Sequence, residues 1–248
     1  MSRTARTALF LASAGGLGFL VVWALTGLPP FGHYPGPYGD IVTHVVQSQR
    51  HMANAVTAVV FDYRGFDTMG EELLLFAAAS AAALLLRETR ESQTSDIVDA
   101  VRSDASRGVG AAAVAVVFVL GLNVVAHGFI TPGGGFQGGV VLAASFALVF
   151  LAVEYHAYHR LVPTSLAEPI EAFGAGAYVG LGLISFGFGL AFLQNFMELG
   201  VFGRLSSGGS AILVNWSSAL AVAGGFLVLF GEYLKEDMAA RYGRARVR

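Results

Sequence analysis

Apolar residues in this chain fall into six long runs, separated by polar or turn-rich segments. The runs cover residues 7–28, 69–87, 108–127, 137–158, 170–195 and 211–234. Each is close to the roughly 20 residues that a helix needs to cross the hydrocarbon core of a bilayer. A spanning segment must satisfy its backbone hydrogen bonds internally, so helices are the expected form. The pattern predicts an all-α integral membrane protein with about six transmembrane helices.

Residues 29–68 lie between the first two runs and are too polar to span a membrane. They begin with PPFGHYPGPYGD, a turn-rich stretch that cannot be helical throughout. Farther along, apolar residues recur near helical spacing and most polar residues fall elsewhere. These apolar residues are Val45, Met52, Val56, Val59 and Val60. We expect one amphipathic helix outside the membrane, lying along the bilayer or packed on another subunit.

The positions of Arg and Lys predict the orientation of the helices. With the N-terminus inside, twelve of the fifteen basic residues fall on inner segments, and the outer segments hold only Arg50, Arg64 and Arg204. Cytoplasmic loops carry an excess of basic residues. Both termini are therefore expected in the cytoplasm, together with a polar linker at 88–107 and a basic tail at 236–248. The first run resembles a signal peptide, but we expect it to remain as a membrane helix.

The stretch TPGGGFQGG, residues 131–139, contains a match to the G-x-G-x-x-G fingerprint of dinucleotide-binding loops. That fingerprint works between a strand and a helix of a compact βαβ unit. Here both flanking segments are apolar runs of membrane-spanning length, and no Lys follows the glycines. The pattern indicates a tight turn between two membrane helices, on the outer side of the membrane.

Composition narrows the class of protein further. Of the 248 residues, 55% are hydrophobic and 13% are charged, and Cys is absent. Disulfides, thiolate metal sites and Cys catalysis are therefore excluded. We predict no catalytic residue, no metal site and no bound cofactor. The six apolar runs also exclude a soluble enzyme.

The stretch FDYRGFDTMGEE, residues 61–72, holds the densest group of charges beside an apolar run. Its charged residues are Asp62, Arg64, Asp67, Glu71 and Glu72. One hypothesis is structural: Thr68 caps the following helix with Glu71 reaching back, and Arg64 forms an ion pair with Asp62 or Asp67. The other is a cation-attracting mouth, because carboxylates beside low-dielectric walls concentrate Na+ or protons.

The turn carries further candidates. His127 could relay protons, because histidine in general changes its charge near neutral pH, although an interfacial His bonded to a helix-end carbonyl is commoner. Asn123 lies one helical turn earlier on the same face. Thr131, Pro132 and Gly133 permit a close turn, and Phe136 and Gln137 are candidates for contacts with another subunit.

Glutamates near the ends of two runs have a simpler interpretation. Glu154 precedes an aromatic and basic belt that includes Tyr158, and Glu232 could pair with Lys235. We expect both to be anchors at helix ends. No Lys, Arg, Asp or Glu lies in the middle of any of the six runs. Ion pumps and channels usually need ionisable groups at depth, so the residues alone favour a packing subunit, or one that contributes only the edges of an ion path.

Two segments resemble a known family. HGFITPGGGFQGGVVLAASFALVFLA, residues 127–152, closely resembles the signature of the B subunit (MnhB) of Mrp-type multisubunit Na+/H+ antiporters. NAVTAVVFDYRGFDTMGE, residues 54–71, is similar to a segment near the C-terminal end of the large A subunit of the same complexes. Both have counterparts in the membrane arms of hydrogenases related to respiratory complex I. Joining the two pieces in one chain departs from the commonest arrangement.

The resemblance implies a division into modules. Residues 1–87 correspond to an A-tail-like module with two membrane helices and the outer amphipathic helix, and residues 108–235 to a B-like module with four membrane helices. Asp62, Asp67, Glu71 and Glu72 match a motif that borders the cation route in this family. His127, Thr131, Pro132 and Phe136 match the B-subunit signature.

The resemblance also implies a function. The chain is expected to be a subunit of a cation/proton antiporter in a prokaryotic cell membrane, with Na+ and H+ as the transported ions. Its partners would be large complex I-like subunits and small membrane subunits, and no nucleic acid. The alternatives are a subunit of the ion-translocating arm of a membrane-bound hydrogenase or oxidoreductase, and a purely structural scaffold.

Overall fold

The computed structural model describes residues 3–28, 32, 36–90, 103–153 and 155–245. It divides into two compact units, Met1–Ile41 and Val42–Arg248. The described secondary structure is helical: α1 (Arg3–Thr26), α2 (Pro37–Arg50), α3 (Ala55–Ala58), a π-helical turn η1 (Val59–Tyr63), α4 (Gly65–Arg90), α5 (Asp104–Ala126), α6 (Gly135–Val153), α7 (Tyr155–Leu161), α8 (Thr164–Gly187) and α9 (Ala211–Ala245).

Six of the described helices are long and apolar enough to cross a membrane: α1, α4, α5, α6, α8 and α9. This confirms the predicted all-α membrane fold with six candidate spans. The first unit consists mainly of α1, none of whose described residues is buried. The other five spans belong to the second unit.

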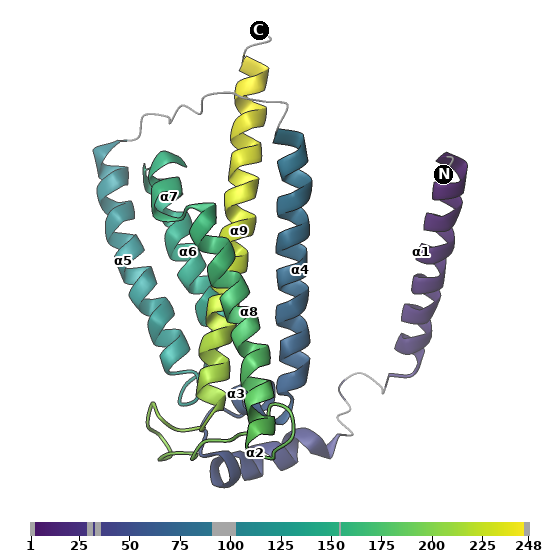
Figure 1. Ribbon diagram of the computed structural model, residues 1–248, viewed down its shortest axis with the longest axis vertical. Helices are drawn as coiled ribbons and strands as arrows, with labels where there is room; N and C mark the ends of the chain where they lie inside the picture. The colour runs from purple at the N-terminus through teal and green to yellow at the C-terminus, as the bar shows by residue number, and fades with distance from the viewer. Residues whose placement is uncertain (1–2, 29–31, 33–35, 91–102, 154, 246–248) are drawn as a thin grey trace. The chain divides into compact units, whose positions relative to one another are not determined.

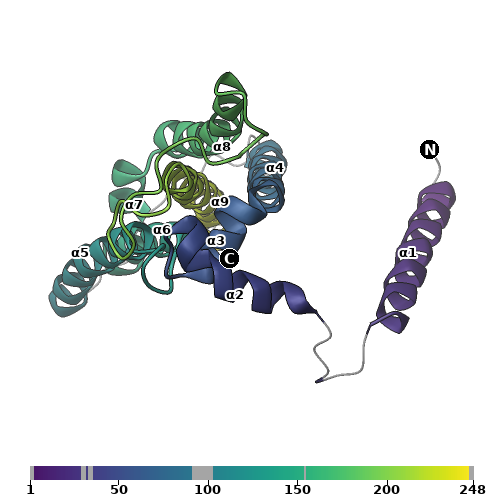
Figure 2. The ribbon, with the colours of Figure 1, turned by 90° about the horizontal axis from the view of Figure 1, so that it is seen from below.

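Helix α9 forms the centre of the second unit. It packs against α4, α6 and α8, and α5 packs on the far side of α6 (Figures 1 and 2). In the membrane-spanning window of α9, 67% of the residues are buried, against 11% in α5. Polar side chains of α9 are therefore enclosed by protein, whereas most of α5 offers an apolar surface to lipid or to a partner.

The glycines after residue 131 let α6 approach its neighbours closely. A Cβ atom at Gly135 would lie 3.0 Å from the backbone nitrogen of Ala219, and one at Gly139 would lie 2.8 Å from its carbonyl oxygen. Both glycines face α9. Gly138 faces α5, where a Cβ atom would lie 2.9 Å from the nitrogen of Val125. The repeated Gly thus allows backbone-to-backbone packing of α6 on both sides.

The second unit has a loop end, formed by residues 42–50 of α2, α3, η1, the turn at 127–134 and the segment 188–210 (Figure 1). The predicted amphipathic helix is present as α2, but its extent and its packing differ from the prediction. It breaks after Arg50, where His51 adopts φ +54°, and its apolar residues Val42 and Val46 pack into this chain's own core with Met52. Val56, which was expected on the apolar face, is 65% exposed.

Several predicted boundaries are also wrong. Helix α4 begins at Gly65 and α8 at Thr164, four and six residues before their apolar runs. Helix α8 ends at Gly187 because Gly189, with φ +73°, closes it, and the Leu190 nitrogen donates to Ser185 O at 3.1 Å. The apolar run continues to residue 195, but its last part is a loop.

The run at 137–158 is divided between α6 and α7. Tyr158 was expected in an interfacial belt, but it is 1% exposed and its hydroxyl donates to Leu227 O at 3.2 Å. Glu154 lies outside the described residues. Residues 91–102, the middle of the predicted linker, also lie outside the described residues, whereas the two ends of the linker are helical. The predicted tail is largely part of a helix, because α9 continues to Ala245.

Candidate functional site

The two sequence segments that resemble separate subunits are joined at the loop end. Asn54 donates through Nδ2 to Gly128 O at 2.8 Å and to Thr131 O at 3.0 Å. Its Oδ1 accepts from the Val56 and Thr57 nitrogens and caps α3. The buried Thr57 hydroxyl donates to Gly128 O at 2.7 Å. Asn54 and Thr57 were missed as site residues, although they lie within the segment that carries the resemblance.

The glycine-rich stretch is the predicted turn between two membrane helices. Gly133 and Gly134 have φ values of +156° and +136°, which non-Gly residues rarely adopt. A Cβ atom at Gly133 would also lie 2.7 Å from Val124 O. The segment before the turn is helical rather than a strand, so the dinucleotide fingerprint does not apply.

His127 is tied into the backbone at the end of α5. Its Nδ1 lies 3.1 Å from the carbonyl oxygen of Asn123, while the Asn123 side chain is exposed. Thr131 Oγ1 donates to His127 O at 3.3 Å. These three residues are linked through main-chain carbonyls and not from side chain to side chain. The same contacts fix the geometry of the turn.

A cavity of about 210 Å³ brings one predicted carboxylate to the turn. It lies between η1, the first turns of α4 and the start of α6. Its lining residues are Val56, Thr57, Val60, Phe61, Thr68, Glu71, Gly133, Phe136 and Gln137. We call this cavity the Glu71 groove. It places Glu71 beside Phe136 and Gln137, while Pro132 is exposed on the turn.

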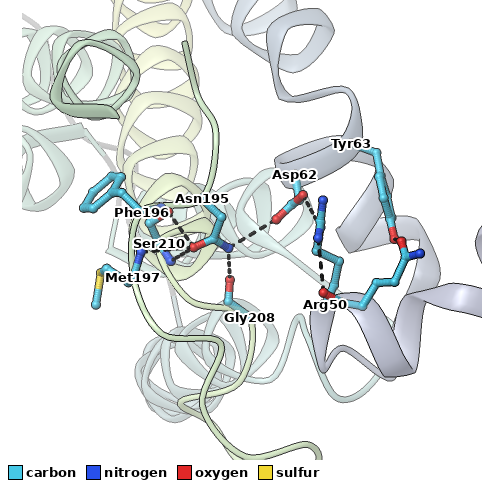
Figure 3. Close-up of polar contacts among 9 residues, drawn as sticks. Arg50, Asp62, Tyr63, Asn195, Phe196, Met197, Gly208 and Ser210 are labelled. Atoms are coloured by element: carbon cyan, nitrogen blue, oxygen red, sulfur yellow. Dashed lines mark hydrogen bonds and ion pairs between the residues drawn. The ribbon is translucent and has the colours of Figure 1, made fainter. Parts of the chain in front are cut away.

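Asp62 is held between two other segments of the loop end (Figure 3). Arg50 Nε donates to Asp62 Oδ1 at 2.6 Å, and Asn195 Nδ2 donates to Asp62 Oδ2 at 3.2 Å. The Arg50 guanidinium also stacks over the Tyr63 ring, 4.9 Å from its centroid. Asn195 in turn binds Gly208 O and the Ser210 nitrogen at 2.8 and 2.9 Å. Asp62 therefore connects α2, η1 and the 188–210 segment.

The other charged side chains of the segment 61–72 do not gather at Asp62 or in the Glu71 groove. Arg64 forms an ion pair with Asp67, and both side chains are largely exposed. The predicted capping box is wrong, because α4 begins at Gly65 and Thr68 lies inside it, donating to Val60 O at 2.7 Å. The carboxylates do not form one cluster in the structure.

Glu72 points into the helix bundle and is 1% exposed. Ser218 of α9 donates a hydrogen bond to its Oε1. On α8, Glu171 is 3% exposed and packs against α9. No charged residue lies in the middle of an apolar run, as the sequence indicates, but these two glutamates are buried inside the bundle within the candidate spans. Because α4 and α8 begin earlier than predicted, both glutamates lie about two turns inside their helices.

Glu232 is another buried carboxyl group. It is 2% exposed and pairs with Lys235 at 2.6 Å, which confirms the predicted pair. As predicted, it lies near the end of the membrane-spanning part of α9, which stops at Glu236, although the helix itself continues to Ala245. Among the residues that the structure describes, no group of three or more His, Cys, Asp or Glu could hold a metal ion.

Comparison with known proteins extends this picture. Residues 106–228 match the family described as a domain related to the MnhB subunit of Na+/H+ antiporters. An uncharacterized protein of Methanocaldococcus jannaschii, MJ1307, is 31% identical over 216 residues, which is 79% of each protein. The chain belongs to the MnhB-related family. The matched domain of this MnhB-related protein contains the glycine turn, α6, α8 and about the first half of the central helix α9.

Two solved structures resemble nearly the whole MnhB-related chain. A chain of the membrane-bound sulfane sulfur reductase (MBS), an archaeal respiratory membrane complex, has a TM-score of 0.70 and 28% identity, over 93% of this chain and 98% of that one. A chain of the Mrp complex from Dietzia has a TM-score of 0.65 and 25% identity, over 94% of this chain but only 26% of that one. The protein is a multi-pass membrane subunit related to chains of both complexes.

Proposed function

We propose that this chain is a subunit of an Mrp-type complex that exchanges Na+ for H+ across a prokaryotic cell membrane. In this proposal, large complex I-like subunits and small membrane subunits complete the complex. The observation that carries the proposal is the Glu71 groove, where Glu71 lies beside Gly133, Phe136 and Gln137 of the family's turn. The resemblance had assigned these residues to two different subunits.

The groove has the properties of an entrance for cations. An exposed carboxylate beside apolar walls attracts cations more strongly than one in open water. Val56, Val60, Phe61 and Phe136 supply those walls, and Glu71 supplies the charge. Asp62 contributes less, because Arg50 and Asn195 already occupy its oxygens. Glu71 is therefore the first of the candidate carboxylates to test.

Replacing Glu71 with Gln should raise the apparent KM for Na+ about fivefold, equivalent to about 1 kcal/mol. The reason is that the amide keeps the shape of the side chain but removes the charge that attracts the cation. Na+-dependent proton flux is measured in vesicles that contain the complex purified from native membranes. Glu198→Gln, an exposed change in the 188–210 segment, is the matched control. An unchanged KM in an intact Glu71→Gln complex would show that the Glu71 groove is not an entrance for Na+.

A second candidate is the membrane arm of a respiratory complex. It is favoured by the end-to-end match with the sulfane sulfur reductase chain, whereas the match with the Mrp chain covers only about a quarter of that longer protein. The same purification separates the two candidates. Recovery of antiporter-like membrane subunits alone supports the exchanger, and recovery of redox subunits in stoichiometric amounts supports the respiratory complex.

The proposed orientation places both termini and the 88–107 linker in the cytoplasm, and the loop end outside. The absence of Cys permits a direct test with single cysteines. In intact cells, a membrane-impermeant thiol reagent should label Ser206→Cys at the loop end and should not label Ser103→Cys before α5. After the membrane is permeabilised, both should react. The reverse pattern in intact cells would show that the basic-residue bias misleads here.

A further inference from the structure

Two carboxyl groups lie inside the bundle with incomplete hydrogen bonding. Glu72 Oε1 accepts from Ser218, but its Oε2 has no hydrogen-bond partner within the described part of the chain. Glu171 Oε1 has none there either, although the residue is only 3% exposed. A charged carboxylate without a partner in such a place costs several kcal/mol. Ionisable residues inside membrane helices therefore point to a function.

Two glycines of the central helix α9 leave room for the Glu171 side chain and backbone. Gly224 and Gly225 of α9 face it, and a Cβ atom at Gly225 would lie 2.9 Å from Glu171 Oε1. At Gly224 a Cβ atom would lie 2.7 Å from Glu171 Cα. Each Gly inside a helix costs about 1 kcal/mol relative to Ala. The two consecutive glycines therefore lower the helix propensity of α9 at this position, but they allow close contact with Glu171.

A cavity of about 320 Å³ lies beside Glu171, between α4, α8 and α9. Ser80, Glu168 and Glu171 are its polar lining residues, and the others are Phe76, Ala83, Leu84, Ala172 and Val228. A water molecule takes up about 30 Å³ of liquid volume. The cavity is therefore large enough for several water molecules, which could carry a proton to or from the carboxyl group.

The buried carboxyl groups follow α9 at regular intervals. Glu72 contacts Ser218, Glu171 contacts Gly225, and Glu232 belongs to α9 itself. Each step is seven residues, which is about 10 Å along a helix. The series begins next to Glu71 of the groove and ends at the Glu232–Lys235 pair. Together these groups extend through the part of α9 that has membrane-spanning character.

The surroundings suit a proton better than a metal cation. Hard cations bind several oxygen ligands at once, whereas Glu72 has Ser218 on α9 beside it and Glu171 has no hydroxyl partner within the described residues. A single proton is enough to neutralise each carboxylate. The titratable neighbours are Glu71 on α4 and Tyr178 on α8 for Glu72, and Glu168 on α8 for Glu171. Within the described part of the chain, no basic residue is among these neighbours.

We propose that Glu72 and Glu171 are proton-binding groups of a path along α9 inside this chain. The path connects the Glu71 groove at the loop end with the Glu232–Lys235 pair toward the other end of the bundle. This inference rests on the proposed function and deepens it: the chain conducts protons itself, in addition to packing beside larger subunits that do so.

The test compares Glu72→Gln and Glu171→Gln in the complete complex from native membranes, with Glu198→Gln as the control. Each of the two variants should lower proton flux at least tenfold, while Glu171→Asp should restore part of it. In infrared pH-difference spectra, each Gln variant should lose a protonated-carboxyl C=O band that wild type and Glu198→Gln retain. Unchanged flux in both variants, with intact complexes, would overturn the path.

Two further outcomes keep the inference separate from the proposed function. If the wild-type complex exchanges no Na+ for H+, the proposed function fails; if it exchanges normally while both Gln variants match it, only the path fails. If the variants do not assemble, the wild-type complex is labelled with dicyclohexylcarbodiimide to test whether Glu72 and Glu171 bind protons. This reagent reacts with protonated carboxyl groups in apolar surroundings. A label at Glu72 or Glu171, located by mass spectrometry, supports the path. Its absence from both contradicts it.

Discussion

Replacing Gly135 with Ala is expected to lower the stability of the folded chain by about 3 kcal/mol, near the upper end of typical overpacking costs. The added methyl group would collide with Asn215 O and lie 3.0 Å from the Ala219 nitrogen. Both atoms belong to the backbone of α9, so relief requires α6 and α9 to separate. The effect is measured as a drop in the thermal midpoint of the purified complex and in the amount of complex recovered from membranes.

Gly176→Ala in α8 is the matched control for this change. It also introduces one methyl group into a membrane helix, but apart from the surrounding turns of α8 no described atom of the chain lies within 4 Å of that methyl group. Because Ala has the higher helix propensity, stability should stay the same or rise slightly. Equal losses from both substitutions would mean that the close approach of α6 to α9 is not what requires Gly135.

Replacing Asp62 with Ala should destabilise the loop end by about 2 kcal/mol. The substitution leaves Arg50, whose side chain is 33% exposed, without its carboxylate, and takes an acceptor from Asn195. Hydrogen bonds to charged groups contribute about 1.5–3 kcal/mol each. The 188–210 segment should open more often, so trypsin should cut faster after the exposed Arg204, and the thermal midpoint should fall.

The comparison for Asp62 is Asp67→Ala. Asp67 also pairs with an Arg, but the two side chains are 48% and 60% exposed. Exposed ion pairs contribute less than about 1 kcal/mol. Asp67→Ala should therefore leave the cleavage rate after Arg204 close to that of the wild type. A similar acceleration in both variants would show that net charge at the loop end matters more than the Asp62 contacts.

The membrane fold could be predicted from the sequence because it depends on the apolar content of long segments. The ends of the helices could not, because they depend on single backbone positions. Gly189 stops α8 while the apolar run continues to residue 195, and α4 begins at Gly65 before the run starts. These shifts changed the function expected for the chain. They moved Glu72 and Glu171 from the edges of apolar runs into the bundle.

The site was predictable where its residues are close in sequence. The turn at 131–139 followed from its glycines and from the two runs that flank it. The ion pair between Asp62 and Arg50 could not be predicted from the sequence. In one continuous amphipathic helix, Arg50 and Asp62 would lie about 18 Å apart, but the break at His51 folds the chain back and brings them together. A reversal of this kind depends on one left-handed residue, and helical periodicity does not reveal it.

The hydrogen bonds from Asn54 and Thr57 to Gly128 imply that genes for such complexes can be split or fused between these residues without loss of the contact. Donors and acceptor are more than 70 residues apart in sequence, on opposite sides of the 88–107 connection. The contacts do not need that connection to be covalent. A gene split at this point would yield two polypeptides that still meet at the same surface, and a gene fusion would keep the interface unchanged. Fission and fusion of open reading frames are therefore compatible with one and the same groove.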